Sequence, residues 1–206
     1  MENYCQYQQH RESDSVWVHL LGILWPSSFW GIQFRILKLK ANRQLREALQ
    51  LLLGELTQQR FWWNHEVRWW SLMREALILA QDLQLEHQSD PEPLLQLFKL
   101  CKNAPQPWQG YDVAYSFVSL SLWSFIQGKA HNALEQVKIA AHADPSWAYP
   151  EYLLGWYGLW LEGIDPVKHF VRAVHLDWQY WERLNQDPQC QEFPEVLSLV
   201  KQEVHR

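Results

Sequence analysis

Residues 133–145, ALEQVKIAAHADP, and residues 166–178, PVKHFVRAVHLDW, carry one pattern twice, at an offset of 33 positions. In both stretches an alanine, Ala140 or Ala173, stands seven residues after the first position, and an aspartate, Asp144 or Asp177, follows four residues later. The apolar positions recur every three or four residues, which is the spacing of one helix face. A repeat period of about 20 to 50 residues is typical of stacked helical hairpins.

A second apolar segment precedes each of these stretches and ends at a glycine. The segments hold Phe117, Leu120 and Phe125 before Gly128, and Leu154, Gly155, Leu159 and Trp160 before Gly163. We therefore expect two antiparallel pairs of helices. Small side chains would let neighbouring helices approach closely, while large rings fill the wider gaps between them. Asp144-Pro145 would end the second helix of the first pair.

Residues from about Tyr111 to Trp181 resemble the tetratricopeptide repeat family, in which paired helices carry a Leu-Gly, a glycine turn, a small-x-x-x-aromatic-x-x-Ala face and Asp-Pro. The resemblance implies a right-handed superhelix of antiparallel helical hairpins that binds other proteins. This chain departs from the family pattern at four positions: Ser121, Ser124, Pro166 and Trp178. The apolar stripe between Phe193 and Val204 predicts a C-terminal capping helix.

The resemblance also implies a concave face lined by the first helix of each repeat. The positions on that face are Tyr115, Val118, Leu122, Tyr149, Tyr152, Trp156 and Trp160. Together they predict an aromatic groove for a helix or extended segment of a partner protein. The alternative is that the N-terminal helices cover this face, which would make the same residues part of the core.

The first half of the chain is also predicted to be helical, because no segment shows a sustained two-residue alternation of apolar residues. The expected helices are residues 28–58, with a break at Asn42, residues 64–85 and residues 93–102. Residues 103–107, NAPQP, form the clearest linker. The fold class is therefore all-α, with an aromatic-rich N-terminal region, 1–104, predicted to pack on two repeats and a capping helix, 105–206.

A basic run lies on the first of these helices. It contains Arg35, Lys38, Lys40, Arg43 and Arg46, and no acidic residue occurs before Glu47. All but Lys40 fall on one broad side of a helix. Next to Trp25 and Trp30, the residues Arg35, Lys38, Arg43 and Arg46 support an alternative function, in which the chain docks on a membrane surface or an acidic partner. The ordinary explanation is a solvated helix face.

A third hypothesis concerns Trp62, Trp63, Trp69 and Trp70. Large flat rings bind flat ligands, so this cluster is a candidate pocket of a ligand-binding protein or enzyme. Core packing is the competing explanation, because Trp62 and Trp69 stand at heptad spacing on an apolar stripe.

Composition excludes several other classes of protein. The net charge of -5 disfavours nucleic acid as the main partner. Cys5, Cys101 and Cys190 form no C-x-x-C pair, so we expect no metal site and reduced thiols in a cytoplasmic chain. If the basic run docks on a membrane, the chain would be membrane-peripheral. The polar N-terminus does not resemble a secretory signal, and polar residues interrupt the apolar stretch 16–37. No hydrolase, phosphate-loop or metalloprotease motif occurs. We therefore expect a scaffold or assembly factor without cofactor, and not an enzyme.

Overall fold

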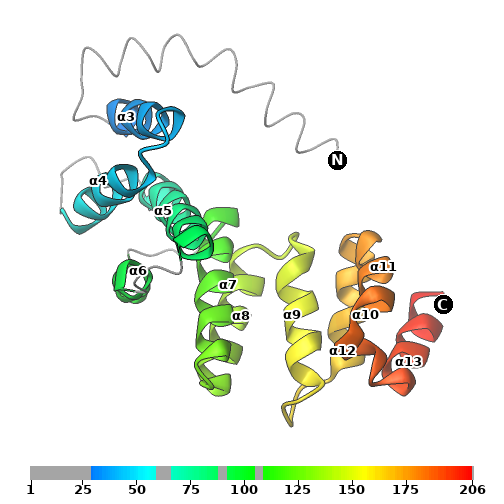
Figure 1. Cartoon of the computed structure of the whole chain (residues 1–206). Helices are drawn as coiled ribbons and strands as arrows, with labels where there is room; N and C mark the ends of the chain where they lie inside the picture. Colours follow the sequence, from blue (N-terminus) through cyan, green and yellow to red (C-terminus); the bar gives the residue numbers. More distant parts are fainter. Residues whose placement is uncertain (1–28, 59–65, 88–91, 105–108, 206) are drawn as a thin grey trace. The chain divides into compact units, whose positions relative to one another are not determined.

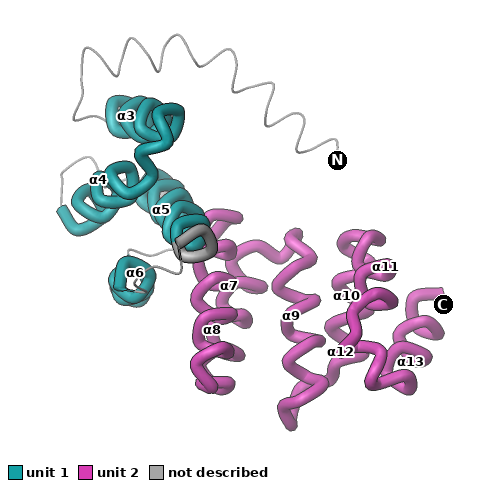
Figure 2. Tube along the Cα trace, viewed as in Figure 1, with its two compact units in different colours: residues 1–104 teal, residues 105–206 magenta. Residues whose placement is uncertain are grey.

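The computed structural model of the chain is all-α (Figure 1). It describes residues 29–58, 66–87, 92–104 and 109–205, and these residues form helices and turns without a strand. The predicted fold class is thereby confirmed. The chain divides into two compact units, residues 1–104 and 105–206, and the division falls within the predicted linker (Figure 2). Among the described residues, no helix is both long and apolar enough to cross a membrane.

Unit 1 contains four described helices. They are α3 (Phe29–Ala41), α4 (Leu45–Thr57), α5 (Glu66–His87) and α6 (Glu92–Lys102). Helix α3 packs against α4, α4 against α5, and α6 against both α5 and α4. The predicted break at Asn42 is present, because α3 ends at Ala41 and the chain turns at Arg43, which has a positive φ of 57°.

The core of unit 1 is formed by one side of each helix. Its most deeply buried side chains include Ile32 and Ile36 of α3, Leu52 of α4, Leu72, Met73 and Leu77 of α5, and Leu97 of α6. On α5, the apolar stripe that includes Trp69 is buried, and its described members are Trp69, Met73, Ala76, Ala80 and Leu83. Its remaining member, Trp62, lies outside the described residues.

Unit 2 contains two helical hairpins followed by three further helices. The hairpin helices are α7 (Tyr111–Ile126), α8 (Ala130–Ala143), α9 (Ala148–Gly158) and α10 (Pro166–Leu176); the last three helices are α11 (Gln179–Gln186), α12 (Pro188–Gln191) and α13 (Pro194–Val204). Helix α7 packs against α8, α8 against α9, and α9 against α10. The hairpins therefore stack in chain order, as Figure 1 shows.

Glycines and aspartates fix the ends of these helices. Gly128 and Gly163 have φ values of 71° and 84°, and each lies in the turn of one hairpin. Positive φ is open to glycine at little steric cost, so these two positions permit the tight reversals. Asp165 caps α10, because its Oδ1 accepts hydrogen bonds from the backbone N–H groups of Val167 at 3.0 Å and Lys168 at 3.3 Å.

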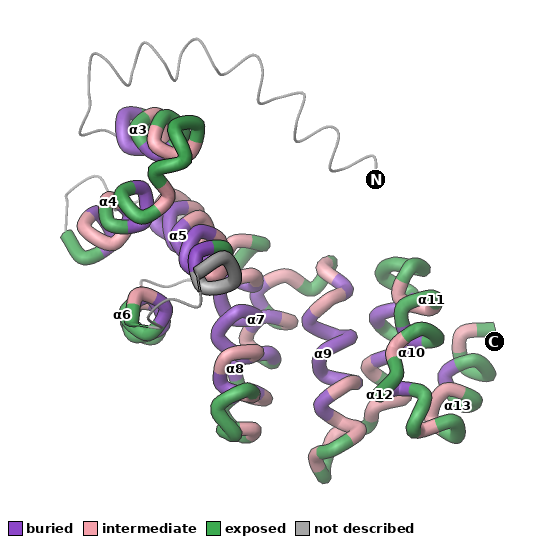
Figure 3. The backbone as a smooth tube through the Cα atoms, viewed as in Figure 1, coloured by how far each residue is buried: buried purple, intermediate pink, exposed green. Residues whose placement is uncertain are grey.

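Small side chains line the seams between the stacked helices. Ala133, Ala140 and Ala173 are fully buried, as is the ring of Phe170 on α10. Figure 3 shows that buried residues take up most of α7 and α9. The structure therefore places the repeated small and aromatic residues in the core, where the sequence pattern predicted them.

The C-terminal end is more elaborate than the predicted single capping helix. Helix α13 lies at the predicted place and packs against α10, but α11 and α12 come before it. Helix α11 also packs against α10. The right-handed superhelix, and the packing of residues 1–104 on the repeats, remain predictions.

Candidate functional site

Aromatic rings follow one another in contact across unit 2. The row begins on α7, passes through the turn before α9 and ends on α11, and its members are Tyr111, Tyr115, Trp147, Tyr149, Tyr152 and Tyr180. Ring centroids are 4.9 Å apart for Tyr111 and Trp147 and 5.8 Å apart for Trp147 and Tyr149. Ring pairs at these distances lie in the favourable range for aromatic contacts.

The turn between α8 and α9 positions the central ring of this row. Asp144 accepts a hydrogen bond at Oδ1 from the Ser146 hydroxyl at 2.6 Å, and its carbonyl oxygen accepts one from the backbone N–H of Trp147 at 3.2 Å. The indole of Trp147 is thereby held against Tyr111, and it stacks on Tyr115 with 17° between the ring planes. Trp147 was missed by the sequence reasoning, because it lies in a turn outside the helical pattern.

A second group of rings lies further along the same two helices. Phe125 of α7 contacts Trp156 and Tyr157 of α9, with centroid distances of 5.2 Å and 4.9 Å. One turn beyond Trp156, Trp160 meets Phe193 edge-on at 5.1 Å. Contacts between rings therefore occur near the beginning and near the end of both α7 and α9.

The spacing along each helix shows that these rings belong to one side of it. On α7 the positions are Tyr111, Tyr115, Val118, Leu122 and Phe125, and from α9 onward they are Tyr149, Tyr152, Trp156 and Trp160. Steps of three and four residues return to the same helix face. We call these nine residues, together with Trp147, the aromatic face.

Members of the aromatic face differ in how much of each side chain is exposed. Val118 and Tyr152 are buried in the core. The predicted contact residues Tyr115, Leu122, Tyr149 and Trp156 are half-buried. Trp160 is 48% exposed, and Tyr111, which the sequence reasoning missed, is 43% exposed. Of the seven residues predicted to contact a partner, five are therefore at least partly exposed to solvent.

Helix α11 covers part of the aromatic face through Arg183. Its guanidinium carbon lies 5.0 Å from the ring centroid of Tyr149, 4.8 Å from that of Tyr152 and 5.7 Å from that of Tyr180. A cation over aromatic faces at such distances is attracted by the ring quadrupoles. A segment that the sequence did not single out thus covers Tyr149 and Tyr152.

Asp187 fixes the most buried ring of this group. The Tyr152 hydroxyl donates a hydrogen bond to the Asp187 carboxylate. Burial raises the pKa of Tyr152 well above its ordinary value, and this hydrogen bond raises it further. Burial likewise raises the pKa of Tyr180 to about 12. An open depression beside these residues is lined by Asp177, Gln179, Tyr180, Glu182, Arg183, Gln186, Asp187 and Pro188.

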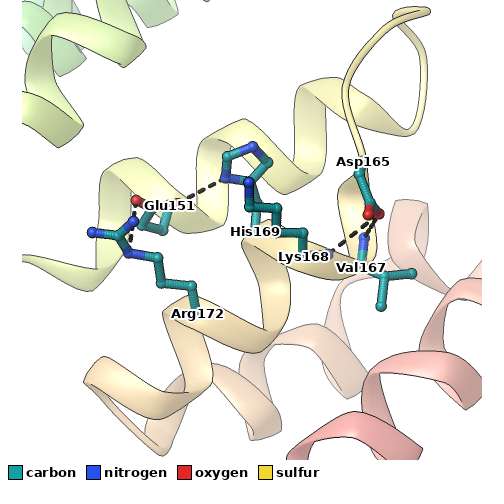
Figure 4. Close-up of polar contacts among 6 residues, drawn as sticks. All are labelled: Glu151, Asp165, Val167, Lys168, His169 and Arg172. Atoms are coloured by element: carbon teal, nitrogen blue, oxygen red, sulfur yellow. Dashed lines mark hydrogen bonds and ion pairs between the residues drawn. The ribbon is translucent and has the colours of Figure 1, made fainter.

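A buried carboxylate joins the two helices of the second hairpin (Figure 4). Oε2 of Glu151 on α9 lies 2.8 Å from Nδ1 of His169, and Oε1 forms an ion pair with Nε of Arg172 at 3.1 Å. Only 5% of the Glu151 side chain is exposed. No sequence motif marks this group, because His169 and Arg172 lie on the next helix.

The basic run lies on the outer side of unit 1. Arg35, Lys38, Arg43 and Arg46 are exposed, and none of them has an ion-pair partner among the described residues. Lys40 differs from them because it pairs with Glu75 of α5. Lys40 is therefore distinguished from the other four by its ion pair, and the end of α3 at Ala41 places Arg43 and Arg46 beyond that helix.

The tryptophan cluster is core as far as the structure describes it. Trp69 and Trp70 are buried and meet edge to face, with centroids 4.9 Å apart. Trp62 and Trp63 lie outside the described residues. In the described part of the chain, no group of three or more His, Cys, Asp or Glu residues is placed to hold a metal ion.

Comparison with known proteins gives no relative for this chain. No protein-family model, curated protein or solved structure matches it.

Proposed function

We propose that this chain is a non-enzymatic protein-interaction scaffold or assembly factor, and that unit 2 holds a segment of a partner protein on the aromatic face. The observation that carries the proposal is the exposure of large rings on that face. Tyr111 and Trp160 are 43% and 48% exposed, and Tyr115, Trp147 and Trp156 are half-buried. Tryptophan and tyrosine side chains dominate the binding energy of many protein interfaces.

The rings are held in place before any partner arrives. Trp147 touches Tyr111, Tyr115 and Tyr149, while Trp156 touches Phe125 and Tyr157. Contacts among neighbouring rings limit the rotamers that each side chain can adopt. Binding to an ordered surface loses less conformational entropy than binding to a mobile one, so this face favours affinity through preorganisation.

The chemistry of the face indicates the kind of segment that it would bind. Indole and phenyl rings supply apolar contact area, and the tyrosine hydroxyls offer hydrogen bonds at their edges. An amphipathic helix or an extended segment with apolar side chains matches both properties. The half-buried Leu122 lies between the two groups of rings on α7 and adds to the apolar part of the surface.

The proposal is tested by affinity capture with the full chain as bait. Partners captured by the unsubstituted protein are identified by mass spectrometry, and capture is then repeated with Tyr111→Ala and with Trp160→Ala. Each substitution removes an exposed ring from the aromatic face, so we expect the specific partner to be lost or captured at least about tenfold more weakly, as for an interface hot spot.

Trp178→Ala is the matched control. Trp178 is 53% exposed, and the ring that it meets is His205, outside the aromatic face. We expect this variant to retain the partner. Helical circular dichroism and the melting temperature show whether each variant is folded. If all three variants are folded and capture every protein as well as the unsubstituted chain does, the aromatic face does not bind the partner.

A further inference from the structure

Helix α3 presents an apolar strip on its outer side. Trp30 is 39% exposed and Leu37 is 48% exposed. They stand seven residues apart, or about two helical turns, so they project on the same side of the helix. Ile32 and Ile36, on the other side of α3, are buried in the core of unit 1. The core therefore occupies one side of α3, and two large apolar side chains remain on the other.

Exposed positive charge lies elsewhere on α3 and in the segment that follows it. Arg35 and Lys38 are exposed on α3, and Arg43 and Arg46 are exposed beyond it, at the turn and in the first part of α4. Among the described residues, no carboxylate forms an ion pair with any of the four. Helix α3 itself contains no acidic residue. The whole chain has a net charge of -5, so this cluster is a local reversal of sign.

We infer that α3 and the turn after it form a docking surface for a membrane that contains anionic phospholipids. Indole rings prefer the headgroup level of a bilayer, where their apolar body is sheltered and their N–H group stays hydrated. Lysine and arginine side chains bury their aliphatic stems and direct their charges toward phosphate groups. Exposed Trp30 and Leu37, with exposed Arg35 and Lys38 on the same helix, combine both properties in one part of the chain.

Charge complementarity selects the anionic bilayer over a neutral one. Each lysine or arginine near an anionic membrane surface strengthens binding by roughly fivefold. With four such residues, the affinity for the membrane depends strongly on the anionic lipid content and on the salt concentration. This docking surface belongs to unit 1. Substitutions in it therefore do not change the residues of the aromatic face, which belongs to unit 2.

The experiment is flotation of the full chain with phosphatidylcholine vesicles, prepared with and without phosphatidylserine. We expect flotation with the anionic vesicles at low salt, and release when salt is raised. Arg35→Glu/Lys38→Glu reverses the two exposed charges of α3. Its partitioning should fall by more than about 25-fold, from the fivefold effect per residue. Trp30→Ala should weaken partitioning while leaving its salt dependence in place.

Lys129→Glu/Lys201→Glu is the matched control, because it makes the same change of net charge at exposed positions of unit 2. We expect it to float like the unsubstituted chain. Arg43→Gln/Arg46→Gln is the second variant, which removes charge without reversing it, and it should also weaken flotation. Circular dichroism shows that each variant is folded.

Three results would overturn the inference. They are no flotation with anionic vesicles at low salt, equal flotation with neutral vesicles, and equal loss in the unit 2 control. Binding of DNA or RNA without any binding of vesicles would assign the cluster to nucleic acid instead. Partner capture by Arg35→Glu/Lys38→Glu remains a separate readout, so failure on vesicles is distinguishable from failure of the proposed scaffold function.

Discussion

Gly155 of α9 lies directly against the ring of Phe170 on α10. A Cβ atom added at Gly155 would lie 2.5 Å from Cδ1 and 2.6 Å from Cε1 of that ring. Non-bonded carbon atoms pack at about 3.5 to 4.0 Å, so no side chain fits there without a shift of the ring or of a helix. Phe170 is fully buried in the core. Glycine at this position therefore sets the distance between the helices of the second hairpin.

Gly155→Ala should destabilise unit 2 although alanine favours helix. The steric clash with Phe170 costs about 1–3 kcal/mol, as overpacking of a core does, and the gain in helix propensity is at most about 1 kcal/mol. We expect a lower free energy of unfolding, measured by urea denaturation with circular dichroism.

Gly54→Ala is the control for this prediction. Gly54 lies in α4, and an added Cβ would meet nothing within 4 Å. This substitution should stabilise the chain by about 0.5–1 kcal/mol. If Gly155→Ala unfolded at the same urea concentration as the unsubstituted chain, the close approach of α9 to α10 would be wrong.

The helical hairpins were predictable from the sequence because their signals are local. Ala133, Ala140 and Ala173 recur at fixed spacing, and Gly128 and Gly163 stand where the chain reverses. Both signals depend on residues a few positions apart. Helix periodicity and turn chemistry therefore predicted the four hairpin helices of unit 2 and their order of pairing.

The part of the candidate site that the sequence did not predict depends on contacts between distant residues. Arg183 lies on α11, a helix of eight residues whose single buried residue is Leu184, so the local sequence does not indicate what the Arg183 side chain covers. Its side chain nevertheless covers Tyr149 and Tyr152. Similarly, the local sequence does not reveal the ion pair of Lys40, because its partner Glu75 lies on another helix. Such pairs are fixed by tertiary packing.

The carboxylate of Glu151 should contribute to stability through its two partners on α10. Glu151→Gln keeps the shape of the side chain but removes the charge that meets His169 and Arg172. Hydrogen bonds to charged groups contribute about 1.5–3 kcal/mol, and partial exposure of Arg172 reduces this effect. We expect a loss of about 1–2 kcal/mol in the free energy of unfolding.

The comparison for this variant is Glu135→Gln. Glu135 pairs with Lys138 at 3.0 Å, but more than half of each side chain is exposed. Surface ion pairs of this kind contribute from about 0 to 0.5 kcal/mol. If Glu135→Gln and Glu151→Gln lower the free energy of unfolding equally in urea denaturation, burial does not strengthen the contribution of Glu151 to stability.

Ser121 connects three helices of unit 2. Its hydroxyl donates to the carbonyl oxygen of Ala133 on α8 at 2.8 Å and lies 2.9 Å from the hydroxyl of Tyr157 on α9. Ser121→Ala would leave the buried hydroxyl of Tyr157 without this contact, at a cost of about 1–2 kcal/mol. A double-mutant cycle with Tyr157→Phe tests the link, and additive effects of the two substitutions would contradict it.

The two described cysteines should resist alkylation in the folded chain. Cys101 and Cys190 are buried, and burial raises the pKa of each thiol to about 12. Thiolate is the reactive form, so neither thiol reacts appreciably near neutral pH. Iodoacetamide followed by peptide mapping should show modification of both only after denaturation. Labelling of either residue in the native protein would show that its part of the core opens readily.

Alkaline pH should destabilise unit 2 through its buried tyrosines. Burial raises the pKa of Tyr180 to about 12, and burial together with the Asp187 hydrogen bond raises that of Tyr152 further. An unfolded tyrosine has a pKa of about 10, so the native state holds these protons more tightly than the unfolded chain. The resulting stability is complete below about pH 10 and is lost as pH rises toward about 12.

We therefore expect the melting temperature to fall between about pH 10 and pH 12, in parallel with tyrosinate absorbance. Tyr180→Phe removes one of the titrating groups, so its melting temperature should fall less steeply over this range. Trp178→Phe changes an exposed ring without a titrating group and should follow the unsubstituted chain. If the slope for Tyr180→Phe equals that of the unsubstituted chain, Tyr180 titrates alike in the folded and unfolded states, and its hydroxyl is not buried in solution.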